Sequence, residues 1–561
     1  MKLSGYGGFY LMSSRLVPQI YDCFKEGYNK KRLMQDTLSG VTVGIVALPL
    51  AIAFAIASGV KPEQGLFTAI IAGLLISLLS GSRVQIGGPT GAFIVVVYDI
   101  VVKFGYNGLA VATMIAGIML VAMGAVRLGG VIKFIPYPMT VGFTSGIALI
   151  IGTTQIKDIF GLQTQAASAG FIHRIESYVQ SASTFNPYSI AVAAAALAII
   201  LIMPKFTKKI PGSIIAILIT TAAVTAFNIP VATIQTEFGE VPSTLPLPSF
   251  PDINLDLVTA VFPSAITIAL LAAIESLLSA VVADGMTSTR HRSNMELVGQ
   301  GVANFFSPLF GGIPATGAIA RTATNIKNGA TSPVSGIVHA ITLLLILMFF
   351  GKWAKLIPMP TLAAVLIVVA YHMSEWRHFL KLLKSPAADI LIMVVTFLLT
   401  VFIDLTVAIE TGVVLSALLF MNRMAETTEV KNFGREVNED FETHDVLSKD
   451  RIPDGVDVFE IFGSFFFGAV NQFKDTLRIV KKKPKVIILR MRTVPYIDAT
   501  AIMALEEVLK KSESEGIQLI LSGISPNLLH TLEKVEFDKK IGRENICPHI
   551  DNALEQAKKF V

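Results

Sequence analysis

The chain has 561 residues, of which 53% are hydrophobic and only 16% charged, and its mean hydropathy is +0.64. A soluble protein of this size carries about 25% charged residues, so this composition excludes a soluble globular protein and indicates a polytopic membrane protein. The net charge of +5 does not indicate a nucleic-acid partner. The two cysteines, Cys23 and Cys547, lie at opposite ends of the chain and show no metal, redox or disulfide spacing.

Apolar segments recur along most of the chain after a mixed N-terminal segment, residues 1–35, which shows no signal-peptide pattern. About 20 apolar residues cross the hydrocarbon core of a bilayer, and shorter segments indicate partial spans. The predicted segments are 41–58, 64–80, 91–102, 108–126, 138–156, 187–203, 212–228, 257–283, 296–310, 333–350, 358–372, 387–403 and 406–421, with 313–328 as a partial span.

Two of these fourteen segments are interrupted by small residues. Segment 91–102 is short and follows Gly88-Pro89-Thr90, while segment 313–328 contains Gly317-Ala318 and then Arg321. Both patterns predict a half-helix preceded by irregular backbone, which a membrane tolerates only where it faces protein or water. Because the two breaks occupy corresponding places in two seven-segment halves, we expect a 7+7 inverted repeat with half-helices at spans 3 and 10.

Span 8, residues 257–283, contains a single charge, Glu275. Placing a carboxylate within the membrane costs a few kcal/mol of free energy, so we expect Glu275 to have a function. Glu275 and Arg321 could neutralise each other within the bundle. Alternatively, they could form a proton-titrating acid beside an anion-binding base, and we favour this second interpretation. The N-termini of the two predicted half-helices present free N–H groups, and the guanidinium of Arg321 matches the geometry of an oxyanion. The region around the second break is therefore suited to bind an anion.

Charges in the loops predict the orientation of the chain. Basic residues recur in the loops that lie on the side of residues 1–35, and the long loop 229–256 on the other side contains only acidic charges. By the positive-inside rule, the N-terminus is expected to be cytoplasmic, although Lys352 and Lys355 are exceptions. We interpret the polar residues at the cytoplasmic end of span 8 as a loop-bracing hydrogen-bond network, which holds the loop in place. They are Asp284, Arg290, Asn294, Glu296 and Asn304.

After Arg423 the composition changes to a polar linker and then to alternating strand and helix patterns. Strands are predicted at 456–462, 486–491 and 517–522, and helices at 499–512, 526–535 and 552–560, which indicates a small cytoplasmic α/β domain. The expected domains are an N-terminal segment at 1–35, a transmembrane transporter domain at 36–424, a linker at 425–452 and the α/β domain at 453–561.

Several motifs resemble those of the SulP anion permeases, or solute carrier family 26, over roughly residues 35–560. They are Gln64-Gly65-Leu66-Phe67, Gly81-Ser82-Arg83, Gly88-Pro89-Thr90, the block Asn294–Asn325, and Asp498-Ala499-Thr500, which resembles the signature loop of a STAS domain. The resemblance is closest to bacterial sulfate and C4-dicarboxylate permeases. It implies a core-and-gate membrane fold, a cytoplasmic STAS domain and a homodimer in the bacterial inner membrane.

The resemblance also implies a substrate site between spans 3 and 10. Its residues are Arg321, Thr90, Phe54, Gly317 and Ala318, and Phe54 is assigned by its family position alone. Where a sodium-coupled bicarbonate relative has Asp and Thr ligands, this chain has Glu275 and Ile319. We therefore expect no metal and no cofactor, and proton coupling through Glu275.

The expected function is secondary-active, proton-coupled symport of a small oxyanion of the sulfate class, without enzyme activity. A C4-dicarboxylate or bicarbonate symporter and a passive anion channel on the same scaffold remain alternatives. A third alternative, a membrane-bound regulator that signals through the STAS domain, is disfavoured because Ala499 stands where anti-sigma-factor antagonists have a phosphorylated serine. A single intramembrane histidine, His339, is interpreted as a packing residue.

Overall fold

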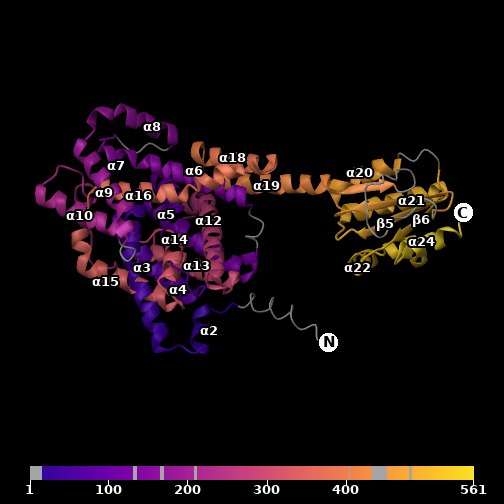
Figure 1. Ribbon diagram of the computed structural model, residues 1–561, viewed down its shortest axis with the longest axis horizontal. Coiled ribbons are helices and arrows are strands. Elements are labelled where there is room, and N and C mark those ends of the chain that lie inside the picture. The colour runs from indigo at the N-terminus through magenta and orange to yellow at the C-terminus, as the bar shows by residue number, and fades with distance from the viewer. Residues whose placement is uncertain are drawn as a thin grey trace. The chain divides into compact units, whose positions relative to one another are not determined.

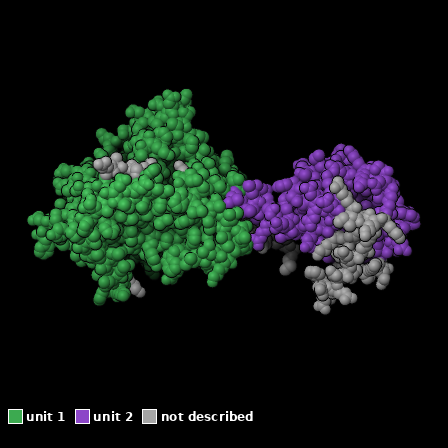
Figure 2. Space-filling model, turned by 90° about the horizontal axis from the view of Figure 1, so that it is seen from above, with its two compact units in different colours: residues 1–414 green, residues 415–561 purple. Residues whose placement is uncertain are grey.

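The computed structural model describes residues 16–130, 136–164, 170–206, 211–403, 405–432, 452–478 and 483–561. The chain divides into two compact units, residues 1–414 and 415–561, which are coloured separately in Figure 2. Most of the expected linker, 433–451, lies outside the described residues, so the boundaries at 35/36, 424/425 and 452/453 stay predictions.

The first unit is almost entirely helical (Figure 1). Its α-helices are α2 (Gln19–Lys25), α3 (Lys30–Ala57), α4 (Pro62–Leu79), α5 (Phe93–Ala125), α6 (Tyr137–Thr154), α7 (Ile156–Phe160), α8 (Phe171–Gln180), α9 (Pro187–Phe206), α10 (Gly212–Phe227), α11 (Ile234–Phe238), α12 (Leu255–Thr287), α13 (Ser293–Phe306), α14 (Ile319–Lys327), α15 (Val334–Ala354), α16 (Met359–Met373), α17 (Trp376–Leu382), α18 (Ala387–Phe402) and α19 (Leu405–Glu426), which continues into the second unit.

A helix lies in every segment that the hydropathy predicts, which confirms an α-helical polytopic fold. Among the described residues, nine helices are long and apolar enough to cross a membrane, and α10 and α18 are shorter apolar helices. The helix α5 covers two predicted spans, because its backbone departs from helical geometry only at Gly105, where φ is +69°. The total of fourteen crossings stays a prediction.

The helices of the first unit pack in two groups. One contains α3, α4, α5, α12, α13, α14 and α15, and the other contains α6, α7, α9, α10, α16 and α18. Small residues let neighbouring backbones approach closely, as is typical of membrane helices. A β-carbon at Gly117 of α5 would lie 2.6 Å from the Gly301 oxygen of α13, and one at Gly142 of α6 would collide with the Met393 oxygen of α18.

The second unit contains a five-stranded sheet covered by helices. Its strands, in spatial order, are β3 (Glu429–Asn432), β4 (Val456–Phe462), β5 (Val486–Thr493), β6 (Gln518–Ser522) and β7 (Ile546–Cys547), and only β3 runs antiparallel to its neighbour. Its helices are α20 (Phe467–Arg478), α21 (Ala499–Glu515), α22 (Pro526–Lys534), α23 (Phe537–Ile541) and α24 (Ile550–Ala557).

Successive residues of a strand face opposite sides of the sheet, and this alternation builds two hydrophobic cores. Phe459 and Leu489 belong to the core that includes residues of α20 to α23, whereas Val458 and Ile488 belong to the core that includes α24. The three predicted strands are present. The elements β3, β7, α20 and α23 were not predicted from the sequence, and β3 falls in the segment that we expected to be linker.

Candidate functional site

The two interrupted segments of the membrane unit meet each other. The break before α5 forms a two-residue strand, β1 (Gly87–Gly88), which pairs antiparallel with β2 (Thr316–Gly317) before α14. The Ala318 nitrogen also donates to the Ile86 oxygen at 2.8 Å. The beginnings of α5 and α14, which are far apart in the sequence, are thereby held beside each other.

Glycine is required at both strands because neighbouring side chains approach the backbone. Gly88 has φ +148°, and a β-carbon there would lie 2.7 Å from Nη1 of Arg321. A β-carbon at Gly317 would collide with the side chain of Gln85, whose amide donates to the Ser276 oxygen at 3.1 Å. A residue with a side chain would push these groups apart, so the small residues of the two breaks have a steric cause.

Buried side chains fix the backbone around β2. Asn304 of α13 donates from Nδ2 to the Ala315 oxygen and accepts at Oδ1 from the Ala315 nitrogen, both at 2.8 Å. The Thr316 hydroxyl donates to the Ala272 oxygen of α12 at 2.9 Å, and the Thr322 hydroxyl accepts from the Ile86 nitrogen at 3.0 Å. The irregular backbone is therefore satisfied by protein, as a membrane interior requires.

Arg321 lies in the first turn of α14, and only 2% of its surface is exposed. Its Nη2 donates to the Pro89 oxygen in the break before α5, so the guanidinium spans the two breaks. Its Nη1 is buried and has no hydrogen-bond partner among the described residues. Buried donors without a partner are rare in proteins, so this nitrogen requires an explanation.

Glu275 of α12 has a different partner. The Thr90 hydroxyl, at the start of the α5 half-helix, donates to its Oε2 at 2.8 Å. No ion pair joins Glu275 to Arg321 in the described part of the chain, where both side chains lie. Glu275 and Arg321 therefore make no direct contact, and whether the two charges neutralise each other within the bundle stays an alternative.

Phe54 of α3 lies against the same half-helix and is 5% exposed. A β-carbon at Gly91 would lie 3.6 Å from Cε1 of Phe54, 3.6 Å from Cδ1 of Ile151 and 3.3 Å from Sδ of Met373. Ile151 of α6 and Met373 of α16 come from the other helix group. Neither residue was predicted from the sequence, because an apolar residue inside an apolar span gives no distinguishing signal.

The start of α14 is open on one side. Gly317 and Ala318 are buried, whereas Ile319 is 42% exposed and Ala320 is exposed as well. The first N–H groups of a helix have no partner within the helix and create a partial positive charge. The structure thus gathers Arg321, Thr90, Phe54, Gly317 and Ala318 around two helix beginnings, with Glu275 at the Thr90 hydroxyl.

His339 of α15 lies close to this backbone break. It is fully buried, and both ring nitrogens lack hydrogen-bond partners among the described residues. A β-carbon at Gly73 of α4 would lie 3.2 Å from the Gly87 oxygen and 3.6 Å from Cε1 of His339. Its contacts are those of a packed side chain, although its sequence context gave no sign that it lies next to β1.

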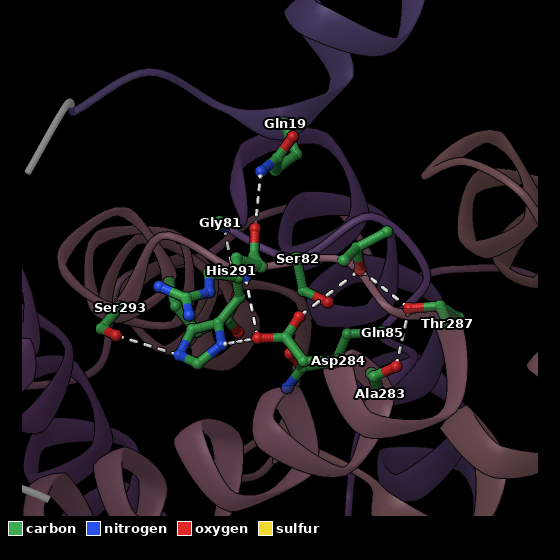
Figure 3. Close-up of polar contacts among 12 residues, drawn as sticks. Gln19, Gly81, Ser82, Gln85, Ala283, Asp284, Thr287, His291 and Ser293 are labelled. Carbon is green, nitrogen blue, oxygen red and sulfur yellow. Dashed lines mark hydrogen bonds and ion pairs between the residues drawn. The ribbon is translucent and has the colours of Figure 1, made fainter. Parts of the chain in front are cut away.

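The polar residues at the end of α12 form a separate network, shown in Figure 3, where Asp284, His291 and Ser293 point toward one another. Asp284 Oδ2 accepts from the His291 nitrogen at 3.0 Å and contacts Nδ1 of the ring at 2.7 Å. Asn294 and Glu296 accept from the backbone nitrogens of other segments. These bonds join loops to helix ends, in agreement with a loop-bracing role.

No group of three or more His, Cys, Asp or Glu side chains that could hold a metal gathers in the part of the chain that the structure describes. The site instead offers one buried guanidinium, two helix beginnings and a hydroxyl inside a unit of apolar helices. Half-helices that meet inside a membrane unit are typical of transporters, in which the half-helix N-termini point at anionic groups of the substrate.

Comparison with known proteins identifies the family. Residues 33–396 match the model of the sulfate permease family, and residues 449–556 match that of the STAS domain. The chain belongs to the sulfate permease family and has a C-terminal STAS domain. It is accordingly a multi-pass membrane protein of an anion-transporter family and not an enzyme.

Relatives share nearly the whole chain. The candidate sulfate transporter YvdB of Bacillus subtilis is 44% identical over 528 residues, which cover 94% of this chain and 98% of that protein. The bicarbonate transporter BicA of a Synechocystis species is 30% identical over 545 residues, covering 94% of each chain. The structure of murine solute carrier 26 family member A9, an anion transporter in the inward-facing state, has a TM-score of 0.87 at 17% identity and covers 100% of this chain and 96% of its own.

Proposed function

We propose that this chain is a secondary-active, proton-coupled importer of a small oxyanion of the sulfate class. The observation that carries the proposal is the buried Nη1 of Arg321, which has no partner among the described residues and lies where α5 and α14 begin. An oxyanion at this position would accept from the guanidinium and from N–H groups of both helix beginnings. Gly317 and Ala318 leave room for its close approach, and Phe54 would close the site on the α3 side.

The position of the Thr90 hydroxyl supports the proposal of proton coupling. In the structure this hydroxyl donates to Glu275 at 2.8 Å, so its single proton is not available to a second acceptor. A protonated Glu275 needs no such donor, because the carboxyl group then carries its own proton. The Thr90 hydroxyl could then turn to the anion. Anion and proton would therefore bind together, and the pair would be less charged than the anion alone.

Bicarbonate is the second candidate substrate. The 30% identity to BicA over 94% of the chain supports it, and the identity to YvdB supports sulfate. Both substrates are small oxyanions that one guanidinium and two helix beginnings could hold. A C4-dicarboxylate would fit the same chemistry, and a passive channel would require no titratable group at Glu275.

Transport by purified protein in liposomes tests the proposal. Labelled sulfate, bicarbonate and succinate are offered under an inward proton gradient, an inward sodium gradient or neither. We expect sulfate to accumulate under the proton gradient alone. Accumulation driven only by sodium would contradict proton coupling, and flux that follows the membrane potential without accumulation would indicate a channel.

Calorimetry on two arginine variants tests the binding site itself. Arg321→Ala should lower anion affinity at least a hundredfold, whereas Arg543→Ala, which removes an exposed guanidinium from the second unit, should leave it unchanged. A folded Arg321→Ala protein with wild-type affinity would remove Arg321 from the site.

We also propose that residues 1–35 and the STAS domain face the cytoplasm of a bacterial cell, that the transporter domain ends near residue 424, and that two copies form a homodimer in the inner membrane. The basic loops that contain Arg290, Arg292 and Arg377 support this orientation through the positive-inside rule. Labelling of single cysteines introduced at residues 352 and 377, in intact cells and in inverted vesicles, tests it. We expect only the first to react from outside.

A further inference from the structure

An apolar groove of about 710 Å³ opens between five helices of the membrane unit, α6, α7, α16, α17 and α18. Ala148, Gly152 and Ile156 line it from α6 and α7, Phe379 from α17 and Phe397 from α18. This volume falls within the range of about 300–1,000 Å³ that is usual for small-molecule sites. Most of the residues that line the groove are apolar, and the polar ones carry only hydroxyl groups (Ser145, Thr153, Tyr371 and Ser374), so the groove suits a hydrocarbon occupant.

The short helix α17 forms one wall and is amphipathic. Trp376, Phe379 and Leu380 face the groove, whereas Arg377 and Lys381 are exposed outside its lining. A helix with an apolar face and a basic opposite face is typical of the boundary between acyl chains and head groups. Lys384 follows directly in the loop and is also exposed, so three cations lie within eight residues.

Aromatic and acidic groups complete the edge of the groove. The guanidinium of Arg377 lies 5.4 Å from the ring centroid of Trp376, and Tyr371 is 56% exposed. Such aromatic side chains are enriched at the membrane interface. The one acid beside them, Glu375, contacts His378 at 3.3 Å and accepts from Tyr137 at 3.4 Å, so its charge has partners of its own.

We propose that this groove binds an acyl chain of an anionic phospholipid, whose head group meets the basic face of α17. The bilayer supplies hydrocarbon chains at the depth of the membrane helices, and clusters of Lys and Arg at its surface attract anionic head groups. Cations at the edge of an apolar groove favour this occupant over a lipid without net charge, which would gain less from Arg377, Lys381 and Lys384.

The groove lies on the same helix segments that contact the candidate anion site. Ile151 and Met373, whose side chains approach Gly91, are chain neighbours of Gly152 and Ser374, which line the groove. The Ser145 hydroxyl donates to the Ser374 oxygen at 2.5 Å and joins α6 to the end of α16 within the groove. A bound acyl chain would therefore stabilise the spacing of α6 and α16, and through it the contact with the half-helix.

A groove-filling variant tests the proposal. No atom lies within 4 Å of a β-carbon built at Gly152, so Gly152→Leu extends into the groove without a backbone clash. The matched control is Gly285→Leu, since Gly285 is also helical and also has no neighbours within 4 Å, but it is exposed and lies outside the groove. Native mass spectrometry counts lipids bound to delipidated full-length protein after addition of phosphatidylglycerol or phosphatidylcholine.

We expect wild type and Gly285→Leu to bind one phosphatidylglycerol tightly and Gly152→Leu to bind it at least tenfold more weakly. Neutralising α17 with Arg377→Gln, Lys381→Gln and Lys384→Gln should remove the preference for phosphatidylglycerol over phosphatidylcholine. Equal binding by Gly152→Leu, or no head-group preference in the wild type, would overturn the proposal. The assay requires no transport, and unchanged thermal unfolding of each variant separates loss of lipid from loss of fold.

Discussion

Thr90 connects the two charged side chains of the candidate site, although it carries no charge. Its hydroxyl donates to Glu275, and its neighbour Pro89 offers the carbonyl oxygen that accepts from Arg321. The site is therefore a chain of contacts, from Glu275 through residues 89–90 to Arg321, instead of a single ion pair. Under the proposed function, a change in the protonation of Glu275 would reach the anion through the Thr90 hydroxyl.

Thr90→Val tests the role of that hydroxyl because valine keeps the branched shape and removes the donor. Hydrogen bonds to charged groups contribute about 1.5–3 kcal/mol, so we expect anion affinity to fall roughly 10- to 100-fold. Thr90→Ser retains the hydroxyl and should stay near wild type. Calorimetry measures the anion affinity of both variants. Equal affinities for the valine and serine variants would contradict a role for the hydroxyl.

Glu275→Gln tests the proton site because the amide has nearly the shape of the acid but stays neutral. We expect the variant to exchange anion for anion across liposomes while failing to concentrate it under an inward proton gradient. A sodium gradient should not restore accumulation, since Ile319 supplies no ligand oxygen. Wild-type accumulation by Glu275→Gln under a pH gradient alone would place the coupling proton on another residue.

At the scale of elements, the paired strands β1 and β2 depend on glycine. Gly88→Ala would place a β-carbon 2.7 Å from Nη1 of Arg321 at a φ of +148°, which residues with a side chain rarely adopt. We expect a loss of anion affinity comparable to that of Arg321→Ala. The control, Gly285→Ala, adds a methyl group to open space in a helix and should stabilise by about 0.5–1 kcal/mol.

Measurements of binding and of thermal unfolding separate the two effects of Gly88→Ala. A variant that unfolds well below wild type and keeps full affinity would mean that Gly88 serves the fold and not the position of Arg321. A variant with wild-type melting and lost affinity would support the steric argument.

Elements were more predictable than the contacts between them. The small-residue runs around Gly88 and Gly317 predicted two breaks, because such runs cannot continue an apolar helix. Their pairing as β1 and β2 involves residues more than 200 positions apart, and no local pattern encodes it. Likewise, Asn304 was predicted to brace a loop, but its bonds to Ala315 at the candidate site depend on how α13 packs.

At the scale of the whole molecule, the second unit has its own sheet and its own cores. Glu460 of β4 is fully buried and contacts Arg490 and Arg492 of β5, each at 3.0 Å. The anion-site residues all lie in the first unit. Stability of the second unit and anion affinity should therefore be separable by mutation.

Glu460→Ala leaves the buried Arg490 without this carboxylate, and breaking a buried pair costs about 3–5 kcal/mol. We expect hydrogen exchange in β4 and β5 of the full-length protein to rise strongly, with anion affinity unchanged. The control is Glu507→Ala, whose exposed pair with Lys474 should contribute less than about 1 kcal/mol. A change of anion selectivity in Glu460→Ala would contradict this separation.

The pairing of β1 with β2 has a mechanical consequence. Because these strands bind the beginnings of α5 and α14 to each other, the two half-helices would move together in the proposed transport cycle. The displacement would then occur at their border with α6 and α16, where Ile151 and Met373 lie near Gly91. The side chains that lie near Gly91 at this border are apolar, whereas β1 and the start of α14 are joined by backbone hydrogen bonds.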